Sequence, residues 1–252
     1  MNKLIIACLL ALVVAGCGRK GPLINPDALR TPAVSDLQAV QKGDHFQVSW
    51  SKPAAPATNK QVADVAVFKV LRREVFPPAQ DCEECTDAYH VLKTVDIEFP
   101  KEVVIRNGRY IISDFDLIPG RIYQYKLVSI LKDNSTALDS NKARRKMLLP
   151  PTAPTLHLTP TSTSIGLEWT QPASAPGSAP LGYNIYRSET GKESALLPLN
   201  SVPITDTRYE DLKAQRNVSY RYTVRAVLTM DKETVESIPS NEMTGTLAAP
   251  EF

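Results

Sequence analysis

The chain has 252 residues, with 29 lysines and arginines against 27 aspartates and glutamates. This near balance gives no reason to expect a nucleic-acid partner, because such proteins usually carry a clear basic excess. The length suffices for two domains of ordinary size, and 20 prolines against 11 glycines favour a β-rich protein with stiff loops. No apolar run after Gly16 is long enough for a membrane-spanning helix.

The N-terminus has the pattern of an export signal. Lys3 supplies a positive charge, residues 4–14 are apolar, and the run closes with V-A-G-C at residues 14–17. It is shorter than the roughly 20 residues that span a bilayer, so it is typical of a secretory signal peptide. V-A-G-C resembles the lipobox of bacterial lipoproteins, which implies that residues 1–16 are removed and that lipid is attached to Cys17. An ordinary secreted protein with an incidental Cys17 is the alternative.

The mature chain would then begin C-G-R-K-G-P-L, at residues 17–23. This start resembles that of small proteobacterial lipoproteins associated with the outer-membrane lipopolysaccharide translocon. The resemblance implies an accessory role there, with Arg19 and Lys20 as candidate contacts to the envelope or to lipopolysaccharide. A generic anchor is the alternative, since basic residues beside a lipid favour any anionic surface. The residue after Cys17 is Gly18 and not aspartate, which resembles the signal that sorts lipoproteins to the outer membrane. Residues 17–32 are expected to form a lipidated tether.

From about residue 33 onward, short alternating apolar segments lie between proline, glycine, asparagine and aspartate clusters. This pattern predicts β-strands, and the chain repeats it. The matching segments are 45–50 and 164–169, which end in tryptophan, 122–129 and 219–226, which carry Tyr-x-Tyr, and the Ser-Asn pairs at 140–141 and 240–241.

This order of a tryptophan strand, a Tyr-x-Tyr strand and a serine-rich last strand resembles fibronectin type III domains. The implied fold class is all-β, with two tandem fibronectin type III-like (immunoglobulin-like) β-sandwiches. Residues 117–123 fit the L-x-P-G-x-x-Y step, in which a tyrosine corner, here Tyr123, bonds back to the backbone. In the second copy, Leu212 and Tyr220 are two positions further apart, so its corner is less well defined. The expected domains are 33–148 and 154–248, and the proline-rich linker 149–153 predicts a semi-rigid rod.

Cys82 and Cys85 lie in a stretch where the first copy is longer than the second. In an oxidising compartment this spacing predicts a local disulfide. The acidic flanks disfavour a redox-active pair, and a metal site with His90 would lack ligands. The insertion is either a partner-binding surface or a tolerated loop that the disulfide clips.

Residues that could carry chemistry are few and scattered. Asp114 and Asp116 precede the Tyr-x-Tyr strand of the first copy, and we match Asp211 of the second copy to Asp116. A position repeated in both copies indicates a turn-forming aspartate and not an acid–base catalyst. The three histidines lie in separate segments and are expected at surface or edge positions: His45, His90 and His157.

Large aromatic side chains on the apolar strand faces are expected to fill the core, the alternative being an exposed carbohydrate platform: Trp50, Trp169, Tyr125 and Tyr222. The basic run 142–146 is expected to form an edge strand of the first sandwich, where charge prevents self-pairing. Recognition of phosphate groups on lipid or lipopolysaccharide is the alternative for this run.

Together these features predict a non-enzymatic lipoprotein without catalytic residues, metal or cofactor, apart from the covalent lipid on Cys17. We expect it in the outer membrane, facing the periplasm, as a scaffold or accessory subunit of an envelope protein complex. The loops expected to bind a partner are 54–61, the insertion with Cys82 and Cys85, and 173–180. The alternative ligands are lipopolysaccharide and a glycan such as peptidoglycan.

Overall fold

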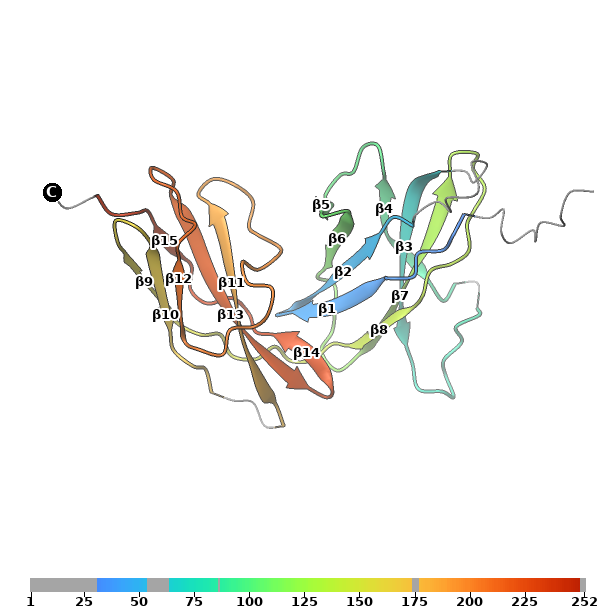
Figure 1. Cartoon of the computed structure of the whole chain (residues 1–252). Coiled ribbons are helices and arrows are strands. Elements are labelled where there is room, and N and C mark those ends of the chain that lie inside the picture. Colours follow the sequence, from blue (N-terminus) through green and yellow to red (C-terminus); the bar gives the residue numbers. More distant parts are fainter. Residues whose placement is uncertain (1–30, 54–63, 86, 174–176, 250–252) are drawn as a thin grey trace, which may run out of the picture.

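The computed structural model describes residues 31–53, 64–85, 87–173 and 177–249 (Figure 1). The expected signal peptide, the Cys17 lipid site, Arg19, Lys20 and the loop 54–61 therefore lie outside the described residues, as do residues 174–176. The described part forms fifteen strands and no helix. Accordingly, no described segment is a helix of the length and apolarity needed to cross a membrane.

The first sandwich packs two sheets around one core. The sheets run in the order β1 (Gln38–Lys42), β2 (His45–Ser51), β6 (Arg109–Asp114), β5 (Val104–Arg106), and β4 (His90–Asp96), β3 (Val65–Val75), β7 (Ile122–Leu131), β8 (Ala143–Lys146). Trp50 of β2 stacks on Tyr110 at a centroid distance of 5.7 Å and meets the edge of Phe68 from the opposite sheet. Inward and outward side chains alternate along β7, as the period-2 pattern predicts.

The second sandwich repeats this plan with seven described strands in place of eight. Its sheets are β9 (Leu156–Pro160), β10 (Ile165–Trp169), β12 (Arg208–Asp211), and β11 (Ala179–Glu189), β13 (Tyr220–Met230), with β14 (Glu233–Glu236) and β15 (Met243–Gly245) both beside β13. Trp169 lies 5.3 Å from the Tyr183 ring across the sheets. All four predicted core aromatics are buried, each at most 5% exposed: Trp50, Trp169, Tyr125 and Tyr222.

Both units are fibronectin type III-like β-sandwiches. In each, a sheet holding the first, second and fifth strands of the family faces a sheet holding the third, sixth and seventh. The tyrosine corner predicted at Tyr123 is present, since the Ile118 N–H donates to its hydroxyl at 2.9 Å. The second copy forms the corner as well, with the Gln215 N–H 3.3 Å from the Tyr220 hydroxyl.

The repeated asparagines fasten the first strand region of each sandwich to its last. Asn141 accepts from the Leu37 N–H and donates to the Leu37 carbonyl, both at 2.9 Å. Asn241 does the same for Leu156, at 2.8 and 2.9 Å. A side-chain amide can replace one rung of a ladder because it carries both a donor and an acceptor.

The two sandwiches are joined by more than the linker. β1 pairs in parallel with β14, so one sheet runs continuously through both domains, and the Gly43 N–H donates to the Glu236 carbonyl at 3.0 Å. The Gln41 side chain binds both the N–H and the carbonyl of Leu148, where the linker begins. Figure 1 shows the sandwiches side by side, meeting at the end that carries β1, β8 and β14.

Gly43 fits this junction because it lacks a side chain. A Cβ there would lie 3.2 Å from the Ile238 Cα and 3.3 Å from the Ser237 carbonyl, both in the second domain. Gly108 also has a positive φ but has nothing within 4 Å of such a Cβ. The two glycines therefore share the backbone requirement and differ in their contact with the second domain.

We expect Gly43→Leu to separate the domains and Gly108→Leu to leave their arrangement intact. Spin labels at Lys132 and Glu168, exposed residues on different domains, would report this as a broadened distance distribution in pulsed electron paramagnetic resonance. Equal broadening in both variants would mean that backbone strain at a glycine causes the effect. It would contradict a junction that depends on the close contact of Gly43 with the second domain.

Candidate functional site

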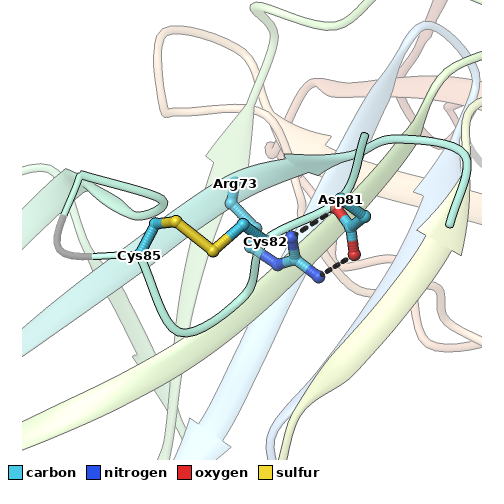
Figure 2. Close-up of a disulfide and its surroundings, with 4 residues drawn as sticks. All are labelled: Arg73, Asp81, Cys82 and Cys85. Carbon is cyan, nitrogen blue, oxygen red and sulfur yellow. Dashed lines mark hydrogen bonds and ion pairs between the residues drawn. A yellow bond between two sulfur atoms is a disulfide. The ribbon is translucent and has the colours of Figure 1, made fainter. Parts of the chain in front are cut away.

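The insertion of the first domain leaves β3 and returns at β4, spanning residues 76–89, and its cysteines form a disulfide. Cys82 and Cys85 are bonded, three positions apart, and both are exposed. Beside them, Asp81 holds the Arg73 guanidinium through two hydrogen bonds of 2.7 and 3.0 Å (Figure 2). Arg73 itself is only 3% exposed, and its hydrogen bonds with the carboxylate lower the pKa of Asp81.

A second set of contacts ties the insertion to β7 and to the basic run. Gln124 donates to the Tyr89 hydroxyl at 2.6 Å and to Glu83 at 2.9 Å. Glu83 also pairs with Lys142, whose ammonium lowers the pKa of that carboxylate. Among the described residues of the insertion, Glu84 and Asp87 are exposed. The described part of the insertion is therefore tied to the sandwich, and its exposed edge carries two acidic residues.

Each sandwich buries one aspartate between an arginine and a tyrosine. Asp114 accepts from Arg72 at 2.8 Å and from the Tyr125 hydroxyl at 2.7 Å. In the second domain, Asp211 accepts from Arg187 at 2.7 Å and from Tyr222 at 2.8 Å. Burial raises the pKa of both tyrosines, and the neighbouring carboxylates raise it further. These tyrosines therefore stay protonated and act as hydrogen-bond donors.

The match of Asp211 to Asp116 was wrong. Asp211 corresponds to Asp114, and each lies 11 positions before the tyrosine that it binds. That equal spacing was readable in the sequence. Asp211 does also accept from the Lys213 N–H, as a turn residue would. Each of the two aspartates in addition holds a half-buried arginine and a buried tyrosine. Asp116 is exposed and binds the outer side of Arg72.

We expect Asp114→Ala to destabilise the first domain by about 2 kcal/mol. It leaves the Tyr125 hydroxyl buried without its acceptor and leaves Arg72 with Asp116 as its remaining carboxylate. Asp116→Ala removes a carboxylate from the same arginine at a side chain 93% exposed, and stability should hardly change. Urea unfolding followed by tryptophan fluorescence measures both. Equal effects of the two variants would contradict the assignment.

The histidines do not gather into a site. His90 and His157 are exposed, as expected. His45 was expected at the surface or an edge, but it is 8% exposed, because the Phe115 ring packs on it at 4.5 Å. Burial lowers its pKa. Within the described ranges, no group of three histidines, cysteines or carboxylates is arranged for a metal ion.

The basic run does form the edge strand β8, as predicted. Two of its side chains reach across to the second domain, where Arg145 pairs with Glu233 at 3.1 Å and Lys146 with Asp231 at 3.0 Å. With Lys142 paired to Glu83, Arg144 is the exposed cation of the run whose charge is not in a described ion pair. The run therefore contributes chiefly to contacts within the chain.

The remaining predicted loop, 173–180, borders a shallow apolar hollow. Ala173 and Pro180 line it together with Pro151 and Leu181, and its volume is about 210 Å³. A carbohydrate platform needs exposed aromatic rings close together. Both tryptophans are buried. The most exposed phenylalanines, Phe99 and Phe115, lie in separate connections.

Sequence reasoning missed a cavity between the domains. It has a volume of about 290 Å³ and is lined from the first domain by Lys42, His45 and Gln47, and from the second chiefly by Tyr186, Ser194, Arg221, Thr223 and Arg225. Behind it lies the Glu236 carboxylate, 2% exposed, which accepts from Tyr186, Asn184 and Lys42. These residues are far apart in sequence, and no motif connects them.

No family model and no curated protein matches the sequence. Among solved structures, the FN1-FN3 domains of chicken CNTN1 align with a TM-score of 0.32 and 17% sequence identity. The alignment covers 85% of this chain and 64% of that one. This likeness concerns the fold alone, and the strand order described above is what defines the fold.

Proposed function

We propose that this chain is a lipid-anchored, non-enzymatic binding protein of the bacterial outer membrane. In this proposal, two sandwiches act as a scaffold or accessory subunit for an envelope protein complex on the periplasmic side. The observation that supports it most directly is the V-A-G-C sequence at residues 14–17, followed by a short tether and two β-sandwich domains. An all-β fold of this type is typical of binding and spacer modules.

The geometry of the ionisable groups agrees with a binding role. The buried carboxylates Asp114, Asp211 and Glu236 are each occupied by an arginine, lysine or tyrosine of the fold. Groups committed in this way stabilise structure and are poor candidates for proton transfer, which requires a group within reach of a substrate. The junction between the domains adds a fixed arrangement of surfaces to which a partner can bind.

A narrower candidate is an accessory factor of the lipopolysaccharide translocon. The start C-G-R-K-G-P-L favours it, since Arg19 and Lys20 would lie beside the acyl chains and face anionic groups of the membrane. Crosslinking identifies the partner directly and separates this candidate from other envelope complexes.

We expect the full chain, expressed in its source bacterium, to incorporate an alkyne-labelled palmitate. Cys17→Ser should lose the label, because lipid requires that thiol, and Cys8→Ser should keep it, because Cys8 lies in the removed segment. In-cell crosslinking with mass spectrometry should then recover an envelope complex from outer membranes with the wild type and with Cys8→Ser. Label retained by Cys17→Ser, or absent from the wild type, would contradict the anchor.

The insertion is tested best by point substitutions. Deleting residues 78–89 would remove Asp81 and Tyr89 and leave Arg73 and Gln124 buried without partners, so it would also disturb the fold. Glu84→Lys with Asp87→Lys reverses the exposed acidic edge and keeps those contacts. Glu98→Lys with Glu168→Lys is a matched control at exposed carboxylates elsewhere.

If the insertion binds the partner, its charge reversal should reduce crosslinked partner at least tenfold, with the control unchanged. Near-native recovery with both double variants would assign partner binding to another surface and leave the insertion as a clipped loop.

A further inference from the structure

The cavity between the domains is a built site, because both sandwiches contribute to its walls and hydrogen bonds hold them together. Gln47 of β2 donates to the Leu196 carbonyl of the second domain at 3.1 Å, and Gly43 donates to Glu236. A second hollow of about 430 Å³ shares the lining residues Ser188, Ser194 and Leu196 with it. Each space is about the size of the smaller sites that bind small molecules.

Its charged lining is mostly basic. Lys42, Arg221 and Arg225 line it, against a single lining carboxylate, Glu242. The buried Glu236 offsets part of this charge, but it already accepts from Tyr186, Asn184 and Lys42. Lys42 and Arg225 both pair with Glu236, and Arg221 pairs with Glu242. The three cations and two carboxylates leave an excess of one positive charge.

The cations also retain unused donors. An arginine has five N–H donors and a lysine three. Arg221 donates to the Lys192 carbonyl and contacts Glu242 at 3.4 Å, so these bonds do not use all N–H donors of its two terminal nitrogens. Arg225 donates to the Ser237 carbonyl. The donors left over suit an acceptor-rich ligand.

The rest of the lining is rich in hydroxyl groups. Ser188, Ser194, Thr223 and Ser240 lie on it, with the amide of Gln47. Hydroxyls both donate and accept, so they match the hydroxyls of a polyol as well as the oxygens of an anion. Positive charge beside such a lining distinguishes this cavity from the apolar hollow at Pro180.

We propose that the cavity between the domains binds a phosphate group carried on a small polar molecule. Arg221 and Arg225 would donate to the phosphate oxygens, because charge-assisted bonds from guanidinium groups are among the strongest that proteins offer to phosphate. Lys42, which stays bound to Glu236 and Tyr186, would contribute its positive charge. The hydroxyl lining would contact the rest of the ligand. The site does not depend on the lipid anchor or on an envelope partner.

Two sources of this chemistry are free inorganic phosphate and a sugar phosphate. Isothermal titration of the full chain in detergent, at constant ionic strength, should use inorganic phosphate, glucose 1-phosphate and glucose. A Kd for glucose 1-phosphate at least tenfold below that for phosphate, with no heat from glucose, supports a phosphosaccharide. Equal affinities would overturn the carried group and leave a site for free phosphate. No heat from either phosphate overturns the proposal.

Variants link the heat to the cavity. Arg221→Gln should weaken binding about tenfold or more, since it removes charge-assisted bonds. Ser194→Trp, at an exposed loop position, should block the cavity without changing its charge. Arg208→Gln removes an arginine of the same domain that is 75% exposed and outside the cavity, so binding should persist. Circular dichroism checks that each variant folds. Equal weakening by Arg208→Gln and Arg221→Gln would mean unspecific charge attraction and would overturn the site.

Discussion

The buried carboxylate of Glu236 is the interaction on which the relation between the two domains depends. Removing such a charge from water is costly unless several donors surround it. Here the donors come from both domains, with Tyr186 and Asn184 in the second and Lys42 in the first. Because the backbone of Glu236 also accepts from Gly43, the same residue fixes the pairing of β1 with β14. The walls of the cavity between the domains are set by this contact.

Within each domain, the same polar devices recur around different loops. Both copies contain an aspartate that is bound by an arginine and a tyrosine. Both also contain an asparagine that bridges the first strand region to the last. The aspartates and tyrosines are buried, whereas the asparagines lie at the surface. All of them are hydrogen-bonded, so they specify one arrangement of the two sheets and not only a hydrophobic collapse. The insertion with Cys82 and Cys85 could be added to the first copy because it leaves these groups in place.

The sequence predicted well those features that depend on local pattern. Period-2 alternation located the strands, and the paired tryptophans and tyrosines located the cores, because burial on one face of a strand leaves a visible repeat. The corner at Tyr220 formed despite the longer spacing from Leu212, since a loop can lengthen while the hydroxyl still reaches the backbone. Asp211 was matched to Asp116 only because both precede the Tyr-x-Tyr strand. The distance in sequence between Asp211 and Tyr222, the tyrosine that it binds, instead identifies it as the counterpart of Asp114.

The junction could not be predicted, because it joins residues near 42 with residues near 236 and leaves no periodic trace. The proline-rich linker alone indicated a semi-rigid rod, yet β1 and β14 add a sheet contact that acts independently of the linker. The contacts of the basic run were equally unpredictable from sequence, since Arg145 and Lys146 pair with acidic residues of the other domain. A local charge pattern does not say whether its charges face water or a neighbouring domain.

The two candidate surfaces use different parts of the molecule, and this separation has a functional consequence. The insertion is fastened to β3 and β7 of the first domain through Arg73 and Gln124, whereas the cavity exists only where both domains meet. A partner bound at the insertion would therefore tolerate movement between the domains. A ligand in the cavity would favour the joined arrangement, because it binds residues of both domains at once. Loss of the junction at Gly43 would consequently abolish one function and spare the other.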